Sequence, residues 1–244
     1  MKADVSRAAR EAAAFVYPER FACVSCGREI FDGSDFCPDC RGKLSRNEGR
    51  FCEKCGMPVE GEERFCLRCE EISCAFERAY AVYRYDEATK PLLRRFKEQG
   101  ERWLGRAFAR EMWAYMREFS IEADLVTFVP SGAKKCGKRG YNPAEALARE
   151  LSEISGIPCE ATLEKVRESD PQKELGFRAR QENLRGCFRL LSARRTETRR
   201  VLLVDDVATT LATANECCGI LSKVCENGVK VLTFCTTVRK IRTE

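Results

Sequence analysis

The sequence predicts two small cysteine-rich modules followed by an α/β domain built on a parallel sheet. Two cysteine quartets of identical spacing follow each other near the start of the chain. Beyond them, apolar strand-like runs alternate with amphipathic helical segments. The apolar runs are continuous, which is typical of strands buried on both faces of a sheet. We therefore expect a helical arm over 1–20, the paired modules over 21–72 and the α/β domain over 73–244.

The quartets are made of Cys-x-x-Cys pairs with the spacing of zinc ligands. Each repeat supplies two tight turns with two thiolates each, which together complete a tetrahedron. Each first pair is followed by a glycine, Gly27 or Gly56, which lets the backbone turn under the metal. Each second pair is preceded by a phenylalanine, Phe36 or Phe65. We expect this side chain to be buried as a hydrophobic prop, that is, a support for a module too small to build a core of its own. We predict tandem zinc ribbons with two structural zinc ions. The ligands, displaced by 29 residues between the repeats, are Cys23, Cys26, Cys37, Cys40, Cys52, Cys55, Cys66 and Cys69.

Three alternatives compete with this assignment. Disulfides are disfavoured because residues 1–20 form a charged amphipathic stretch without the apolar core of a signal peptide, so we expect a cytoplasmic protein. Iron–sulfur ligation is disfavoured because its common spacings differ. An interleaved arrangement, in which the first and third pairs share one ion, stays open, although a strict tandem repeat favours two sequential ribbons.

The composition excludes several classes of protein. Among the 244 residues no apolar run approaches the length of a membrane span. The chain contains no histidine, which excludes Cys–His and Ser–His–Asp catalysis. We interpret the cysteines outside the quartets as small buried hydrophobic residues. These are Cys74, Cys136, Cys159, Cys187, Cys217, Cys218, Cys225 and Cys235.

The charge is unevenly spread along the chain. Residues 21–72 carry eight basic and eleven acidic side chains, a balance of −3. Two four-thiolate zinc sites would bring this to about −7. Residues 73–244 carry 31 basic and 24 acidic side chains, a balance of +7. A polyanion should therefore meet the larger domain and not the ribbons.

The first half of the α/β domain has clear strand and helix signals. Residues 78–86 alternate like a strand, and 88–100 form an amphipathic helix that stops at glycine. A second amphipathic helix covers 101–119. An apolar strand over 124–130 then leads into a basic loop, 131–141.

The second half repeats this alternation. Asn142 is a natural cap for a helix over 143–155, while 159–190 is irregular, basic and rich in glutamine. Residues 199–206 form a buried strand that is followed by a threonine-rich loop. A helix then covers 212–228, and another buried strand covers 229–238.

Two loops at the carboxyl ends of the predicted strands carry the candidate chemistry, because ligands of such sheets bind there. One is VLLVDDVATTLAT (201–213), in which two carboxylates precede hydroxyls and a helix start. Carboxylates can accept hydrogen bonds from a diol or hold hydrated magnesium, and amides at a helix start can hold a phosphate. The other is SGAKKCGKRGYN (131–142), whose four cations suit a pyrophosphate.

Residues 201–213 resemble the phosphoribosyl-pyrophosphate motif of type I phosphoribosyltransferases, in which four apolar residues and two acids precede TTG-x-T. Over 76–240 the chain resembles the ComF family, also called competence or GntX-like proteins. The resemblance rests further on YRYDEATKPLLRRFKEQG, VPSGAKKCGKRGYNPAEALA and QKELGFRARQENLRGCF. The residues that fall where the family pattern expects them are Lys97, Arg139, Gly140, Asn142, Gln172, Leu175, Arg180, Asn183, Gly186 and Phe188.

The resemblance implies a type I phosphoribosyltransferase-like domain and assigns roles to its residues. Asp205 and Asp206 would bind the ribose hydroxyls. The basic loop would contact the pyrophosphate with magnesium through Lys135, Lys138 and Arg139. The 5′-phosphate would lie on the loop formed by Thr209, Thr210, Leu211, Ala212 and Thr213. Catalysis would be electrostatic, by stabilising an oxocarbenium ion and the departing pyrophosphate.

Two positions depart from the family pattern. Leu211 stands where the family has glycine, and a leucine forced into an unsuitable conformation costs about 1–3 kcal/mol. Pro143 stands where the family usually has glutamine. Whether the site turns over therefore stays open at this point.

Three functions follow from the resemblance. The first is a ComF-like protein that binds phosphoribosyl pyrophosphate or single-stranded DNA and supports DNA uptake and natural transformation. The second is an active phosphoribosyltransferase acting on a small base or amine. The third is a non-catalytic adaptor whose ribbons dock a competence helicase or another protein. A nucleoside triphosphatase is disfavoured, because Arg139 replaces the Ser or Thr that a P-loop needs at the end of GAKKCGKR (132–139).

Overall fold

The computed structural model describes residues 21–57, 59, 61–71, 73–168, 182–191 and 199–237. The helical arm expected over 1–20 lies outside these residues, as do three positions of the family pattern, Gln172, Leu175 and Arg180. By its contacts the chain divides into two compact units, 1–44 and 45–244. The division falls between the two cysteine quartets, whereas the sequence places a boundary after residue 72.

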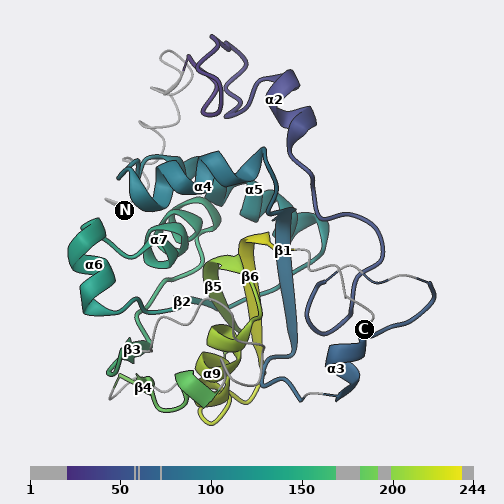
Figure 1. Cartoon of the computed structure of the whole chain (residues 1–244), viewed down its shortest axis with the longest axis vertical. Helices are drawn as coiled ribbons and strands as arrows, with labels where there is room; N and C mark the ends of the chain where they lie inside the picture. The colour runs from purple at the N-terminus through teal and green to yellow at the C-terminus, as the bar shows by residue number, and fades with distance from the viewer. Residues whose placement is uncertain are drawn as a thin grey trace, which may run out of the picture. The chain divides into compact units, whose positions relative to one another are not determined.

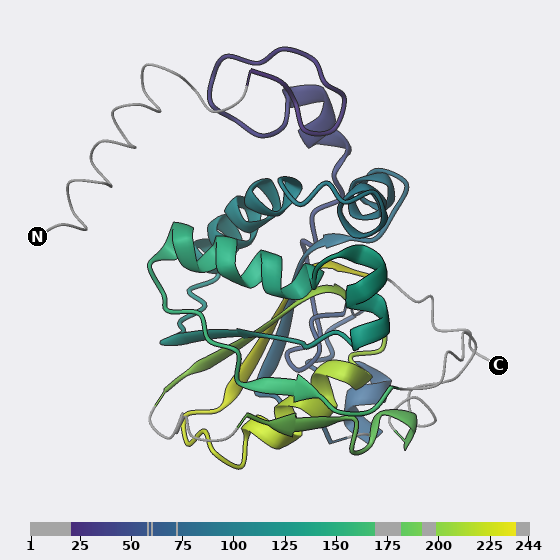
Figure 2. The ribbon, with the colours of Figure 1, turned by 90° about the vertical axis from the view of Figure 1, so that its left-hand side faces the viewer.

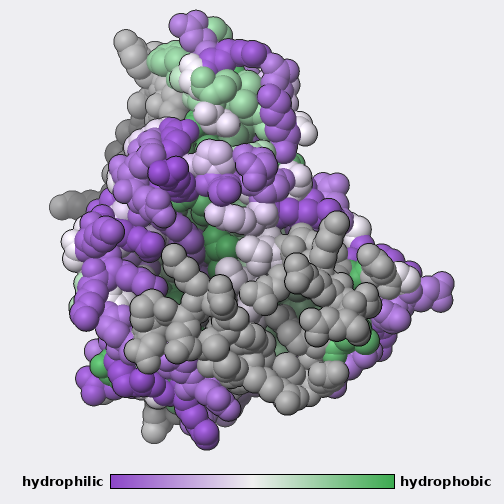
Figure 3. Space-filling model, in the orientation of Figure 1, coloured by the Kyte–Doolittle hydropathy of each residue, from purple (hydrophilic) through white to green (hydrophobic). Residues whose placement is uncertain are grey.

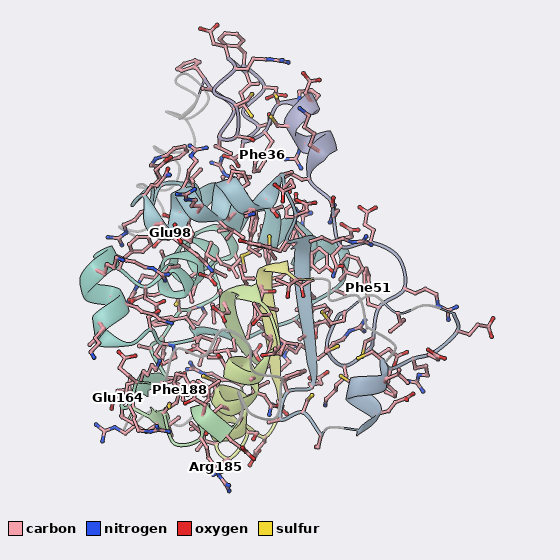
Figure 4. The ribbon with its side chains drawn as sticks, in the orientation of Figure 1. Phe36, Phe51, Glu98, Glu164, Arg185 and Phe188 are labelled. Atoms are coloured by element: carbon pink, nitrogen blue, oxygen red, sulfur yellow. The ribbon has the colours of Figure 1, made fainter. Side chains whose placement is uncertain are left out.

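The first unit is a ribbon held around the first quartet. Cys23 and Cys37 form its small core with Ile30, and the short helix α2 (Pro38–Lys43) carries the last cysteine. Phe36 is buried, as the predicted prop should be (Figure 4). Figure 3 shows hydrophobic residues at the surface of this ribbon. Phe21 and Phe31 are its exposed large hydrophobic side chains among the described residues.

The second unit is built on a parallel sheet with the order β1-β6-β5-β2 (Figure 1). Its strands are β1 (Arg78–Arg84), β2 (Leu125–Phe128), β5 (Val201–Ala208) and β6 (Val229–Thr236). The two central strands, β5 and β6, pair in register from Val201 opposite Val229 onward. Their continuous apolar runs are buried, which confirms the prediction of strands covered on both faces.

Helices cover both faces of this sheet (Figure 2). One face carries α4 (Thr89–Glu98), α5 (Leu104–Glu118) and α7 (Pro143–Ser155), and the other carries α9 (Ala212–Leu221). The ring of Phe108 on α5 stacks on that of Phe234 on β6, with centroids 4.1 Å apart. No helix among the described residues has the length and apolar character needed to cross a membrane.

The second ribbon is bonded to the edge strand of the sheet. The amide of Asn47 donates to Val82 O at 2.9 Å, and that of Ala79 donates to Lys54 O at 2.8 Å. A Cβ added to Gly56 would collide with the carbonyl oxygen of Ala79. The ribbon therefore pairs with the exposed edge of β1, which an open sheet would otherwise leave unpaired.

The structure corrects three expectations. The predicted basic loop 131–141 contains a helix, α6 (Ala133–Arg139), which ends at Gly140 with a φ of 77°. The region 159–190, expected to be irregular, contains two short antiparallel strands, β3 (Leu163–Lys165) and β4 (Phe188–Leu190). The last helix ends at Leu221, seven residues before the predicted Gly228.

The second ribbon also has a short helix, α3 (Leu67–Glu71), which contains its last cysteine, Cys69. The predicted prop of this ribbon, Phe65, is 37% exposed, so this expectation is wrong. The second ribbon hydrogen-bonds to β1 and does not depend on a core of its own. A buried phenylalanine is therefore not needed at this position.

Candidate functional site

A pocket of about 230 Å³ lies beyond the carboxyl ends of β2 and β5. Two carboxylates, Asp205 and Asp206, line it from the end of β5. Four cations line it from three other elements: Lys97 on α4, Lys135 and Arg139 on α6, and Lys165 on β3. The cations exceed the carboxylates by two, so the pocket favours an anionic ligand that also offers hydroxyl groups to the acids.

The two carboxylates have different environments. Lys97 on α4 places its Nζ 2.8 Å from Asp206 Oδ1, and both side chains are largely shielded from solvent. Asp205 accepts a hydrogen bond of 2.8 Å from the backbone amide of Asp206. Burial and then the negative charge of Asp206 raise the pKa of Asp205 to about 7, although Lys97 works in the opposite direction. Asp206 is therefore neutralised by an ion pair, and Asp205 exchanges its proton near neutral pH.

The loop after β5 leads directly into a helix. Leu211 has φ 59° and ψ 8°, a left-handed conformation that glycine adopts readily, and α9 begins at Ala212. Thr213 in the first turn lines the pocket. Thr209 is exposed and Thr210 is buried, and neither lines the pocket.

The leucine at position 211 leaves the shape of this loop intact. Its side chain is 6% exposed and so is packed inside the protein. The amide of Ala212 donates to Thr210 Oγ1 at 3.4 Å. The departure from the family glycine therefore adds conformational strain without removing the turn that starts the helix.

The predicted basic segment supplies to the pocket two of the three cations that were expected to contact the pyrophosphate. Lys135 and Arg139, four residues apart on α6, line the pocket, while Lys138 is exposed and lies outside the lining. Gly137 and Lys138 lie inside this helix instead of in a glycine-rich loop, which is a further argument against a P-loop.

Asn142 fixes this segment to the helix that follows. Its Oδ1 caps α7 by accepting from the amide of Ala144 at 3.2 Å, as predicted, and also accepts from Ser131 Oγ at 2.9 Å. Its Nδ2 donates to Val129 O at 3.0 Å. The end of β2 and the start of α7 are thereby held together at the pocket wall.

Sequence reasoning missed Lys165 and gave Lys97 no role. Lys165 comes from β3, in the region expected to be irregular, and its side chain is 8% exposed. Its Nζ lies 5.9 Å from the ring centroid of Phe188 on β4, which also lines the pocket. The signal for Lys97 was its place in the family pattern, but only the fold shows that it reaches Asp206.

The two quartets form two separate thiol clusters. In each cluster the four sulfurs lie within 4.8 Å of one another. Cys26 Sγ lies 3.8 Å from Cys37 Sγ, and Cys55 Sγ lies 3.6 Å from Cys66 Sγ. Sulfurs about 2.3 Å from a tetrahedral zinc ion would be about 3.8 Å apart. The clusters therefore fit one zinc ion each in the sequential arrangement, and Gly27 and Gly56 have the predicted positive φ of 75° and 68°.

Comparisons with known proteins agree with this geometry. A double zinc ribbon family model matches residues 12–70. Competence protein F of Haemophilus influenzae is 28% identical over 212 residues, which are 84% of this chain and 92% of that protein. DNA utilization protein YhgH of Escherichia coli is 27% identical over 80% of this chain and 88% of its own length. Competence protein ComFC of Bacillus subtilis is 26% identical over 72% and 73% of the two chains.

Solved structures with a similar arrangement are phosphoribosyltransferases. The glutamine phosphoribosylpyrophosphate amidotransferase of B. subtilis is 25% identical with a TM-score of 0.35, over 53% of this chain and 26% of that one. This chain thus spans about a quarter of that enzyme's length. A purine phosphoribosyltransferase of Pyrococcus horikoshii is 18% identical with a TM-score of 0.35, over 55% and 73% of the two chains.

Two four-cysteine sites in front of a parallel α/β domain, with paired acids on a central strand, define a double zinc ribbon protein with an α/β domain. The relatives that match along most of the chain carry the names of competence and DNA utilization proteins. The chain is therefore similar, over most of its length, to competence protein F and to the other proteins of these names.

Proposed function

We propose that this ComF-like protein binds phosphoribosyl pyrophosphate with magnesium in the pocket at the end of β5, and that it handles single-stranded DNA during uptake. The observation that carries the first part is the joint position of the acids and cations: Asp205 and Asp206 share one pocket with Lys97, Lys135, Arg139 and Lys165. The ligand would be a sugar that carries several phosphates.

The acids suit the ribose. Carboxylate oxygens accept hydrogen bonds from the two hydroxyls of a diol, and the pocket offers two carboxylates at its floor. Because Lys97 already holds Asp206 at 2.8 Å, the position of that carboxylate is fixed before a ligand arrives. Such pre-organisation lowers the entropy that binding must remove.

Two other parts of the pocket would bind the phosphate groups of the ligand. The 5′-phosphate would lie at the start of α9, where Thr213 offers a hydroxyl and the first turn offers amides. The pyrophosphate would lie against Lys135 and Arg139 on α6. The two anionic ends of the ligand then lie on either side of the acid pair.

Magnesium fits this donor set, because it prefers oxygen ligands and keeps several waters. Asp205 and Asp206 are the carboxylates of the pocket that would hold the hydrated ion, together with oxygens of the ligand. When bound, the ion would neutralise charge on the pyrophosphate. The protein's own residues would place the ribose and hold the leaving pyrophosphate by charge, without a covalent nucleophile.

Turnover is a second candidate, favoured by apolar residues that line the pocket. Leu184 and Phe188 give part of the pocket wall an apolar surface, and Phe188 is 5% exposed. An apolar wall beside a sugar site is suited to a flat base. Release of pyrophosphate from the donor in the presence of candidate bases would test this.

Support for DNA handling comes from charge and from the relatives. The basic surplus of +7 lies in residues 73–244. Two of the matched relatives are named for competence or DNA utilization. The affinity for a single-stranded oligonucleotide should fall steeply with salt and should survive removal of residues 1–44. If removal of these residues abolishes binding, the first ribbon carries the contact and the charge argument is wrong.

The test of ligand binding is calorimetric titration with magnesium phosphoribosyl pyrophosphate. Wild-type protein should give saturable heat, and Asp205→Asn should lose it. Asp124→Asn is the matched control, because Asp124 pairs with Arg200 away from the pocket at 2.7 Å. Absence of heat from the wild type, or equal heat from wild type and Asp205→Asn, would contradict the proposal.

A further inference from the structure

One carboxylate near the pocket belongs to neither the ribose site nor a surface ion pair. Glu168 follows β3 and reaches back to the loop after β2. A Cβ added to Gly132 would collide with both of its carboxylate oxygens. Gly132 itself lines the pocket. The space that this glycine leaves open is therefore filled by a negatively charged group from another part of the chain.

The groups around this carboxylate are those that would hold a ligand's anion. Lys165 Nζ lies 3.4 Å from Glu168 Oε2, and the amide of Lys134 lies 3.4 Å from Oε1. Lys165 lines the pocket and is nearly buried, whereas Glu168 keeps 37% of its side chain exposed. Desolvation raises the pKa of Glu168, but the charge of Lys165 and the amide of Lys134 outweigh it and leave that pKa below its usual value.

We propose that Glu168 is an internal competitor that occupies an anion position between Gly132 and Lys165 and must withdraw before a diphosphate binds there. This inference rests on the proposed function and adds a means of regulating the same site. Lys165 is the cation that changes partner, from the carboxylate of its own chain to an oxygen of the ligand. The affinity for the ligand then depends on how strongly Glu168 competes with the ligand for Lys165.

The exposed fraction of Glu168 makes the exchange feasible. A carboxylate at the rim can turn into water and recover its hydration, while the nearly buried Lys165 stays in place. Withdrawal of Glu168 also clears the space against Gly132, where the absence of a side chain lets a ligand approach the backbone.

The experiment measures the affinity of the full-length protein for inorganic pyrophosphate by calorimetry. Glu168→Gln removes the charge, and Glu168→Asp keeps the charge but withdraws the carboxylate by one methylene. The matched control is Glu164→Gln on β3, where Glu164 pairs with Arg189 at the surface at 2.6 Å (Figure 4). Thermal melting of each variant verifies that it is folded.

We expect Glu168→Gln to bind pyrophosphate about tenfold more tightly than wild type, because close like charges repel and Lys165 becomes free. Glu168→Asp should gain several-fold, and Glu164→Gln should change by less than about twofold because solvent screens it. If Glu168→Gln gains no more than Glu164→Gln, or Glu168→Asp binds like wild type, internal competition is refuted while the proposed function stands. If no variant binds pyrophosphate at all, internal competition is refuted, and the titration with magnesium phosphoribosyl pyrophosphate decides the proposed function separately.

Discussion

Lys97 Nζ, from a helix on one face of the sheet, lies 2.8 Å from Asp206 Oδ1 at the end of a central strand. This ion pair neutralises the charge of Asp206. At the neighbouring Asp205, burial and the charge of Asp206 make the charged form unfavourable. The pocket therefore contains a carboxylate that is most stable protonated when no ligand is bound.

Asp205 should lower the stability of the ligand-free protein as the pH rises. Its pKa is raised to about 7, so the folded state keeps a proton that the unfolded state releases near pH 4. Between these values the folded state binds more protons, and the free energy of unfolding falls with increasing pH. Asp205→Asn removes this loss and should be more stable than wild type by on the order of 2 kcal/mol at pH 8.

Urea unfolding of both proteins at pH 4 and pH 8 checks this. The difference should be small at pH 4, where Asp205 is protonated in the folded state, and should grow toward pH 8. A difference that is the same at both values would show that the aspartate does not titrate as described.

The second zinc site should support the α/β domain, and the first should not. Residues around the second quartet hydrogen-bond to β1, while the first quartet belongs to a separate compact unit. Cys55→Ser should therefore lower the melting temperature of the α/β domain, and Cys26→Ser should leave it unchanged. The two tryptophans, Trp103 and Trp113, both lie in the larger unit, so their fluorescence reports on that unit. Equal effects of the two variants would contradict the asymmetry.

Gly56→Ala and Gly27→Ala form a matched pair of substitutions. Both glycines have positive φ, and an alanine in that conformation costs about 1 kcal/mol. Only at Gly56 would the new Cβ also meet a backbone carbonyl, since nothing lies within 4 Å of the corresponding point at Gly27. Chemical denaturation followed by tryptophan fluorescence should show a loss of about 2–4 kcal/mol for Gly56→Ala, in the range of overpacking costs. It should show none for Gly27→Ala, because the cost at Gly27 falls on the first unit, 1–44, which contains no tryptophan.

At Leu211, substitution by glycine should destabilise the protein less than substitution by alanine, which is the reverse of the usual order in a helix or strand. The left-handed backbone favours glycine over alanine by about 1 kcal/mol, while either substitution loses a buried side chain worth about 2 kcal/mol or more. Leu211→Gly should therefore be less stable than wild type but more stable than Leu211→Ala. Thermal unfolding measures this order, and an alanine variant more stable than the glycine variant would show that the backbone strain is absent.

The sequence predicted the parts of the fold that depend on local pattern. Continuous apolar runs located β2, β5 and β6, alternation over 78–86 located β1, and the cysteine spacing located both thiol clusters. The acids at 205 and 206 were found because a buried strand ended in two charges. Each of these signals lies within a single short stretch of sequence, of which the cysteine quartets, 23–40 and 52–69, are the longest.

The features that sequence reasoning missed depend on contacts between distant segments. Lys165 reaches the pocket only because β3 pairs with β4, more than twenty residues further on. The exposure of Phe65 follows from the packing of its ribbon on β1, which no property of the ribbon itself indicates. The helix α6 was read as a loop because glycines and lysines outweighed its helix-forming residues, although Gly140 ends it in a typical left-handed cap.

The most direct measurement is a crystal structure of the full-length protein with magnesium phosphoribosyl pyrophosphate. The account predicts density for the ribose against Asp205 and Asp206, with the 5′-phosphate at the start of α9 beside Thr213 and the pyrophosphate facing Lys135. A structure in which the ligand lies elsewhere, or in which residues 205–213 close on themselves and admit no anion at saturating ligand, would contradict it.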